Sequence, residues 1–205
     1  MYLPKIREVK EALTSFFSKP YTTKFPAEKF TPSEHYRGFP RYYAKACVGC
    51  GTCEQVCPAT AITITDDLGL KKRTLVINYA SCMNCGQCQE KCITEKGIIL
   101  GNEYSFSYMD KNDKSIFEQV EKELVLCEIC GEIIAPRDHL NWVKSRLGAK
   151  AYAHPNFLLE TQREFFEVEP SEPKSRIRRE DQIKEVCPKC RQKVVVEDEF
   201  YAFTE

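Results

Sequence analysis

The sequence lacks long hydrophobic runs, an export signal and an excess of charge of either sign. No stretch approaches 18 consecutive apolar residues, so we expect no membrane-spanning segment. The first ten residues contain no apolar core and no small-residue cleavage site, so we expect no secretory signal. The 205 residues include 30 Lys and Arg and 30 Asp and Glu, whereas a general nucleic-acid binder is expected to be basic. We therefore expect no nucleic-acid partner.

Recognisable catalytic motifs are also missing. The sequence has no Gly-rich dinucleotide fingerprint, no nucleophile motif and no acid–base pair. Its three histidines, His35, His139 and His154, were weighed as metal ligands. Because the cysteine sets described below are complete without them, polar or capping roles are favoured. We predict no catalytic residue in this chain.

Cysteine, in contrast, is abundant. All twelve cysteines fall in C-x-x-C or C-x-x-x-C clusters. Such spacing is typical of metal ligands, because a disulfide framework spreads its cysteines over the chain. Together with the missing export signal, this clustering predicts thiolates that hold metal in a reducing, cytoplasmic compartment.

The first eight cysteines form two copies of C-x2-C-x2-C-x3-C, offset by 35 residues throughout, as from Cys47 to Cys82. A constant offset indicates two copies of one structural unit. Three closely spaced thiolates wrap three corners of a cubane, glycines let the backbone approach it, and the fourth cysteine reaches the other cluster. The pattern predicts two [4Fe–4S] clusters. Their ligands are expected to be Cys47, Cys50, Cys53 and Cys92 for the first cluster, and Cys82, Cys85, Cys88 and Cys57 for the second.

Zinc is the alternative for these eight cysteines, but one zinc ion cannot employ two quartets of thiolates. The second motif departs from the usual pattern, since Ile93 follows Cys92 where Pro58 follows Cys57. Proline is not a ligand, so we expect an altered turn and not a lost cluster.

The last four cysteines form two separated C-x-x-C pairs. They are Cys127, Cys130, Cys187 and Cys190. Four thiolates in two such turns predict one closed tetrahedral metal site, with zinc favoured over iron. A closed site is structural, and we expect it to staple a module with little core of its own. A redox dithiol is the alternative.

The pattern of residues predicts an α+β protein in three parts. These are an N-terminal helix and extended docking arm (1–45), a double-cluster domain (46–110) whose motifs resemble those of ferredoxin-like proteins, and a zinc-ribbon-like four-cysteine module with a helical insert (111–205). Helices are expected from Pro4 to Ser18, over Lys114–Leu126, after Pro136 up to Gly148, and over Phe157–Phe166. Strands are expected at Ala61–Thr65, Thr74–Asn78, Gly97–Leu100 and Lys193–Phe203, with a linker at 168–180.

The two motifs resemble those of bacterial-type 2[4Fe–4S] ferredoxins. With the segments from His35 to Gly38 and from Asn102 to Tyr104, residues 1–110 resemble the ferredoxin-like subunit of respiratory complex I. They are equally similar to its relatives in group 4 membrane-bound hydrogenases, formate hydrogenlyases and membrane-bound sulfane reductases. The extra cysteine pairs resemble an extension of the formate hydrogenlyase type, which favours the hydrogenase side.

The resemblance implies an electron-transfer subunit without a catalytic centre of its own. It implies a peripheral position on the cytoplasmic side of the cell membrane. It also implies partner subunits that include a cluster-bearing or catalytic neighbour, with an external ferredoxin as a candidate electron donor. Two alternatives remain: a freely diffusing ferredoxin, and a zinc-ribbon interaction protein.

Overall fold

The structure is a computed structural model that describes residues 5–110, 113–166, 181 and 183–201. The chain divides into two compact units, Met1–Tyr36 and Arg37–Glu205. The linker predicted at 168–180 lies outside the described residues. No helix among the residues described here combines the length and the apolar character that crossing a bilayer requires.

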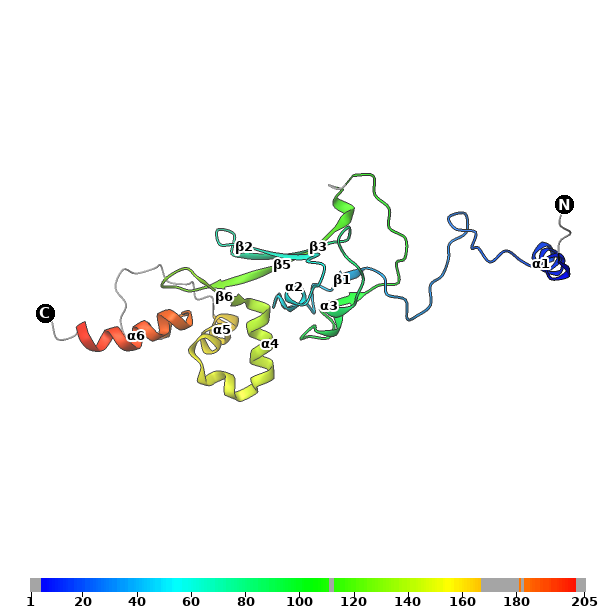
Figure 1. The fold of residues 1–205 in the computed structure, drawn as a ribbon. Helices are drawn as coiled ribbons and strands as arrows, with labels where there is room; N and C mark the ends of the chain where they lie inside the picture. The colour runs from blue at the N-terminus through cyan, green and yellow to red at the C-terminus, as the bar shows by residue number, and fades with distance from the viewer. Residues whose placement is uncertain (1–4, 111–112, 167–180, 182, 202–205) are drawn as a thin grey trace. The chain divides into compact units, whose positions relative to one another are not determined.

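Within its described residues, 5–36, the N-terminal unit contains one helix, α1 (Ile6–Phe17), followed by a segment without further helix or strand (Figure 1). The Lys5 N–H donates to Glu8 Oε2 at 3.0 Å, which fixes the start of the helix. The Ser18 N–H donates to the Thr14 carbonyl at its end, so the predicted helix is confirmed. None of its residues is buried, and Ile6 is 91 % exposed.

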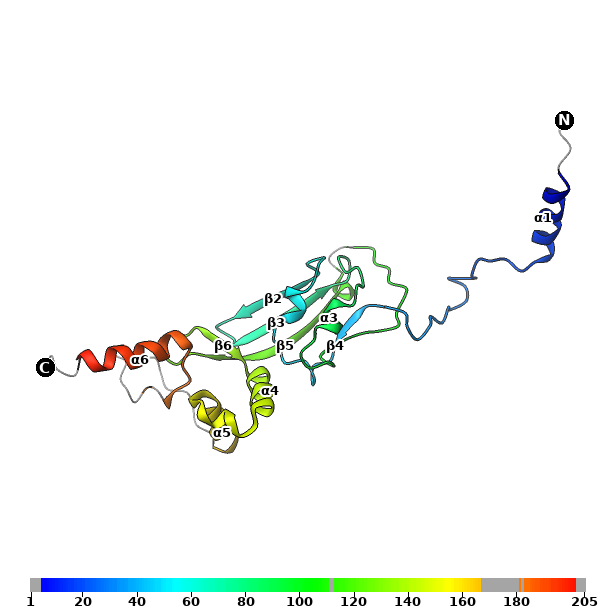
Figure 2. The same ribbon diagram turned by 60° about the horizontal axis from the view of Figure 1, so that its bottom comes forward.

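In the second unit, two short sheets lie beside the cysteine motifs. Strand β1 (Pro40–Tyr42) pairs antiparallel with β4 (Ile98–Leu100). The other sheet has four antiparallel strands in the order β2–β3–β5–β6, which run side by side in Figure 2. Its first hairpin joins β2 (Ile62–Asp67) to β3 (Lys72–Asn78). The three strands predicted between residues 61 and 100 are therefore confirmed.

The helix predicted over Lys114–Leu126 is wrong. This segment forms a 3-10 turn, η1 (Lys114–Ile116), and then strand β5 (Phe117–Leu126), which pairs along the whole of β3. Within β5, Val120, Lys122 and Leu124 are buried, which is the alternation of a strand. A lysine on the buried face hid that alternation, so only the fourfold spacing of the apolar residues was visible. The sheet continues across the predicted domain boundary at residue 110.

The core of the cluster-motif region combines the two sheets with the cysteine loops. Among its buried members, Leu75, Ile77, Ile98 and Ile116 are almost completely enclosed. These side chains come from β3, β4 and η1, so the core draws on segments far apart in the sequence.

The C-terminal part continues from β6 (Ile133–Pro136) directly into α4 (Arg137–Leu147). A 3-10 segment, η2 (Gly148–Ala153), and α5 (Pro155–Phe165) follow. The two helices predicted here are confirmed. The strand predicted at Lys193–Phe203 is wrong, because α6 (Pro188–Tyr201) covers most of this segment. Pro188 favours the first position of a helix, and this outweighs the strand preference of the valines at 194–196.

Candidate functional site

The two cysteine loops have matching backbones. Gly51 (φ 85°) and Gly86 (φ 84°) precede two short helices, α2 (Thr52–Gln55) and α3 (Gln87–Glu90). Both glycines adopt the left-handed conformation, which they reach without the penalty of a Cβ atom. Further equivalent pairs with positive φ are Gly49 and Asn84, and Thr60 and Glu95. The 35-residue repeat of the sequence is thus a repeat of backbone geometry.

The first group of predicted ligands surrounds one cavity. Its lining includes Cys47, Cys50, Cys53 and Cys92. Three of these cysteines come from the first motif, whereas Cys92 is the last cysteine of the second. Apolar side chains, among them Leu75 and Ile98, complete the wall.

The second group surrounds another cavity. Its lining includes Cys57, Cys82, Cys85 and Cys88, with Ile62 and Leu100 among the apolar neighbours. Here the last cysteine of the first motif joins three of the second. The structure therefore brings each predicted quartet together around its own cavity.

Hydrogen bonds hold the two loops in equivalent ways. Glu54 Oε1 accepts the Ile64 N–H at 2.9 Å, and Gln89 Oε1 accepts the Leu100 N–H at 2.6 Å. Each acceptor follows the third cysteine of its motif and ties the loop to a neighbouring strand. These two residues were not predicted from the sequence, although their 35-residue offset was an available signal.

The cysteine sulfurs also have neighbouring hydrogen-bond donors. The Ala61 N–H donates to Cys57 Sγ at 3.3 Å. The hydroxyl groups of Thr52 and Thr94 lie 3.3 Å from the sulfurs of Cys50 and Cys92, respectively. Donors of this kind stabilise negative charge on sulfur and influence cluster potentials.

Burial dominates the electrostatics of the most enclosed thiols. It raises the pKa of Cys53 to about 12 and the pKa of Cys88 to about 11. Burial also acts to raise the pKa of Cys92, but its hydrogen bonds, led by that with Thr94, lower it overall. Buried thiolates need compensating positive charge, which coordinated iron supplies. Two four-thiol cavities with apolar walls, hydrogen-bond donors and closely approaching backbone fit [4Fe–4S] clusters.

The remaining cysteines form a third site. Their sulfurs lie within 4.8 Å of one another, and the residues are Cys127, Cys130, Cys187 and Cys190. Cys130 is exposed and the other three are buried. This arrangement matches the donor set of a tetrahedral four-cysteine site. The chain thus brings together all four predicted ligands, which lie up to 63 positions apart in the sequence.

Backbone groups shape the third site. Gly131 has φ 72°, and its N–H donates to the Cys127 carbonyl at 2.9 Å, closing the first turn. The Cys187 N–H donates to Cys127 Sγ at 3.3 Å. Burial acts to raise the pKa of Cys127, but backbone donors, led by that of Cys130, lower it to about 7. Cys127 is therefore prepared to bind metal as a thiolate.

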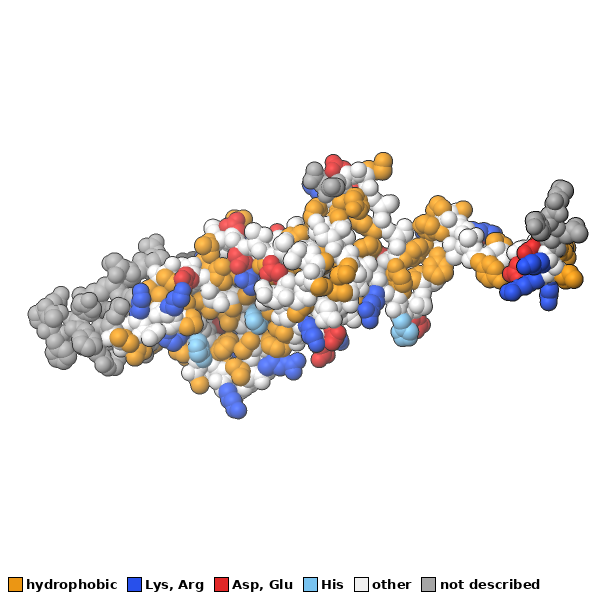
Figure 3. Space-filling model, viewed as in Figure 1, with side chains coloured by type: hydrophobic (Ala, Val, Ile, Leu, Met, Phe, Trp, Pro, Cys, Tyr) orange, Lys and Arg blue, Asp and Glu red, His pale blue; other side chains and the backbone are white. Residues whose placement is uncertain are grey.

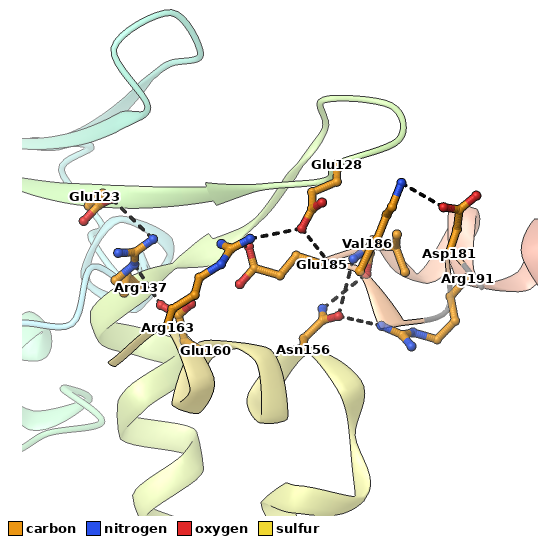
Figure 4. A network of polar contacts seen from close by, with 11 residues as sticks. Glu123, Glu128, Arg137, Asn156, Glu160, Arg163, Asp181, Glu185, Val186 and Arg191 are labelled. Atoms are coloured by element: carbon orange, nitrogen blue, oxygen red, sulfur yellow. Dashed lines mark hydrogen bonds and ion pairs between the residues drawn. The ribbon is translucent and has the colours of Figure 1, made fainter. Parts of the chain in front are cut away.

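A network of charged side chains lies beside the third site (Figure 4). Arg163 on α5 forms ion pairs with Glu128 at 3.1 Å and with Glu185, which lie next to the two cysteine pairs. Glu160, on the same helix, contacts Arg137 Nε at 2.8 Å. Burial, with a smaller contribution from Glu160, raises the pKa of Glu185 to about 7. The network joins α5 to both halves of the site.

Asn156 provides a second link from α5. Its Nδ2 donates to the Val186 carbonyl at 3.2 Å, and its Oδ1 accepts from Arg191 at 2.5 Å (Figure 4). These polar residues were not predicted from the sequence, because their partners lie 22 to 35 positions away. His154 Nδ1 accepts the Asn156 N–H at 3.3 Å, so its predicted capping role is confirmed.

Comparisons with known proteins gave one family match and several similar proteins. Residues 46–96 match the family described as a 4Fe-4S dicluster domain. The chain is 30% identical to a chain in the structure of "the membrane-bound sulfane sulfur reductase (MBS), an archaeal respiratory membrane complex". That match covers 53% of this chain and 58% of the other, with a TM-score of 0.40.

Three curated relatives extend the comparison. The chain is 37% identical to NADH-quinone oxidoreductase subunit I 2 of Geobacter metallireducens over 100 residues. This match covers 45% of this chain and 76% of that protein. The chain is 32% identical to NAD(P)H-quinone oxidoreductase subunit I of Gloeobacter violaceus, over 46% of this chain and 47% of the relative.

Formate hydrogenlyase subunit 6 of Escherichia coli is 27% identical, over 59% of this chain and 66% of the relative. The chain thus spans between about half and three quarters of these relatives, and the resemblance drawn from its motifs is confirmed. The alignment with the Geobacter protein spans 45% of this chain, yet it covers 76% of that relative. By this measure the chain belongs to the family of NADH-quinone oxidoreductase subunit I.

Proposed function

We propose that this chain relays single electrons through two [4Fe–4S] clusters, as a subunit of a complex I-related oxidoreductase. The observation that carries the proposal is the sorting of eight cysteines into two four-thiol cavities, each completed by a cysteine of the other motif. A [4Fe–4S] cluster, when bound, accepts and releases one electron. The family membership and the 4Fe-4S domain support the same function.

The chain's own residues hold the clusters and control their surroundings. Cys57 and Cys92 would connect the two sites, since each belongs to one motif and lines the cavity of the other. The apolar walls limit the access of water, and the loop hydrogen bonds of Glu54 and Gln89 keep the thiols in position. Fixed thiols reduce the rearrangement that accompanies a change of charge.

Partner subunits follow from the family and from the exposed N-terminal unit. The relatives are named as subunits, including one of formate hydrogenlyase. Phe16, Phe17 and Tyr21 are exposed, and Figure 3 shows further hydrophobic side chains along the segment after α1. Such a surface suits burial against other proteins. We place the chain peripherally, on the cytoplasmic side of the membrane, between an electron donor such as a ferredoxin and a cluster-bearing or catalytic neighbour.

The third site is proposed to hold one structural zinc ion. Four sulfurs within 4.8 Å of one another offer a closed tetrahedral donor set, with no position left for a substrate. Removal of the ion should unfold the region around α5 and α6, while the two cavities lined by the first eight cysteines persist. The test is Cys127→Ser with metal analysis and hydrogen exchange. Iron in place of zinc would change the metal assignment, and an intact, metal-free region would contradict the structural role.

Anaerobic analysis of iron and sulfide in the purified chain tests the main proposal. We expect about eight irons and about eight labile sulfides, and EPR signals of two interacting clusters after reduction. Gel filtration of a native extract tests the placement in a complex, because a freely diffusing ferredoxin would elute as a small monomer. A strictly anaerobic preparation with zinc but no labile sulfide would overturn the electron-relay proposal.

A further inference from the structure

Two positive charges face each other in the sheet beside the first cysteine loop. Arg73 on β3 and Lys122 on β5 are direct cross-strand partners. Like charges in this position destabilise a sheet. Both side chains are also largely buried, with exposed fractions of 17% for Arg73 and 8% for Lys122. An arrangement with this energetic cost points to a role beyond holding the two strands together.

Both cations reach the backbone around the first motif. Arg73 Nη1 donates to the Gly49 carbonyl at 3.0 Å, and Lys122 Nζ donates to the Ala44 carbonyl at 2.5 Å. The stem of Lys122 lies against the loop itself, because a Cβ added at Gly49 would be 3.0 Å from its Cγ. The two side chains therefore converge on the segment that carries Cys47 and Cys50.

The counterions of the two cations differ. Asp66 forms a two-point pair with Arg73, with its oxygens 2.7 and 2.8 Å from the guanidinium nitrogens. Asp138, which pairs with Lys122 at 2.7 Å, has a side chain 52% exposed to water. Water weakens the field of an exposed carboxylate more than that of a buried ammonium group. The charge of Lys122 is therefore the less compensated of the two where it faces the loop.

The charge of Lys122 lies beside the backbone that leads to the proposed ligand Cys47, because its Nζ donates to the Ala44 carbonyl three positions earlier. At the second loop, the cation that donates to the backbone is Arg37, whose Nη1 lies 3.3 Å from the Cys85 carbonyl oxygen. Arg37 is exposed, so its charge is screened by solvent. The two loops thus differ in the burial of the cation that contacts them.

We propose that Lys122, supported by Arg73, raises the reduction potential of the cluster held by Cys47, Cys50, Cys53 and Cys92. The inference rests on the proposed function. A cluster with four thiolate ligands is anionic and gains a further negative charge when reduced, so a buried cation stabilises the reduced form more. Lys122 is not a ligand in this proposal. It acts on the cluster only through its charge. Strand β5, which carries Lys122, would then make the reduction potentials of two otherwise similar clusters differ.

Redox titration of the cluster-loaded full chain, followed by EPR, tests the inference. Cys50→Ser and Cys85→Ser, at equivalent positions of the two motifs, assign the signals to the two clusters. In Lys122→Met we expect the midpoint potential of the first cluster to shift negatively while that of the second stays in place. Lys122→Arg should restore most of the shift. The matched control is Lys72→Met, which removes an exposed lysine paired with Glu121 in the same sheet and should shift neither midpoint.

Asp138→Asn is the second variant, for the case that Lys122→Met fails to assemble the first cluster. The half-exposed Asp138 side chain tolerates this substitution. Removal of this counterion should shift the first midpoint positively. Unchanged midpoints in Lys122→Met, or equal shifts of both clusters, would overturn the inference, as would the lack of a positive shift in Asp138→Asn. Iron and sulfide content separates this result from failure of the proposed function, since a wild-type chain without two clusters fails before any midpoint is compared.

Discussion

The two cysteine loops share one backbone but have different surroundings. Gly51 and Gly86 have φ angles of 85° and 84°, and the acceptors Glu54 and Gln89 fix the loops through equivalent hydrogen bonds. Around them the likeness ends. The first loop lies against the four-stranded sheet and contacts the buried stem of Lys122, whereas the second has a loop contact from an exposed arginine.

The four thiols of each site and the side chains around them therefore come from different parts of the chain. The repeated residues determine how four thiols are presented. Residues outside the repeat, on β3, β5 and α4, determine which charges and side chains surround the first loop. Two sites with one ligand geometry can thus differ in potential, in tolerance to substitution and in response to pH.

Replacement of the last cysteine of either motif by serine should have the largest effect on the two sites. We expect Cys57→Ser to lose the second cluster, and Cys92→Ser to lose the first, although each residue belongs to the opposite motif. Each variant should lose about four of about eight irons. Metal analysis and EPR on anaerobic protein would measure the loss.

The midpoint potential of the surviving cluster identifies which site was lost. Cys50→Ser and Cys85→Ser serve as controls, because each of these residues lies in the motif and in the cavity of the same site. If Cys57→Ser removed the same cluster as Cys50→Ser, the assignment across the motifs would be wrong.

The cysteine pattern was the part of the structure most accessible to sequence reasoning. Spacing and repetition predicted the quartets that the two cavities bring together, and alternating apolar residues predicted β2 and β3. Strand β5 was missed because a lysine occupies its buried face at position 122, where a strand pattern has an apolar residue. That lysine bonds to Ala44 and Asp138, contacts that exist only in the folded chain.

The C-terminal part shows the same limit. The valines at 194–196 favour a strand by local preference, but Pro188, which follows Cys187, begins α6. The polar network around Arg163 depends on partners 22 and 35 positions away, so no local pattern could reveal it. Sequence thus predicted which cysteines come together better than it predicted the side chains that surround them.

Exchange of the residues at equivalent positions 49 and 84 should sharpen the comparison through stability. Both have positive φ, 70° at Gly49 and 53° at Asn84. In Gly49→Asn the new side chain meets Lys122 Cγ at 3.0 Å, so we expect the free energy of unfolding to fall by about 1–3 kcal/mol. Asn84→Gly keeps the backbone conformation accessible and should cost less than about 1 kcal/mol.

Thermal unfolding of the loaded protein under anaerobic conditions compares the two variants. Gly86→Ala is a useful control, because its Cβ would lie 3.4 Å from Leu100, an ordinary contact, and its cost reports the positive φ alone. Equal destabilisation by Gly49→Asn and Asn84→Gly would mean that the packing of Lys122 does not distinguish the two loops.

The smallest expected effect concerns pH, and it again belongs to the surroundings of the first loop. Burial, followed by the nearby charge of Arg73, lowers the pKa of His139 on α4. A histidine whose pKa is depressed in the folded state contributes stability above its unfolded pKa of about 6.5, and this stability is lost as pH falls through the folded value. In the wild type, the hydrogen-exchange protection of the α4 amides should decrease as pH falls from about 7.5 to 5.5. In His139→Gln this decrease should be smaller, by less than about 1 kcal/mol of opening free energy. Hydrogen exchange, corrected for intrinsic rates, measures this difference, with His35→Gln in the exposed N-terminal segment as the control. An unchanged pH dependence in His139→Gln would contradict a lowered pKa of His139, and with it the combined effect of burial and of the charge of Arg73 on α4.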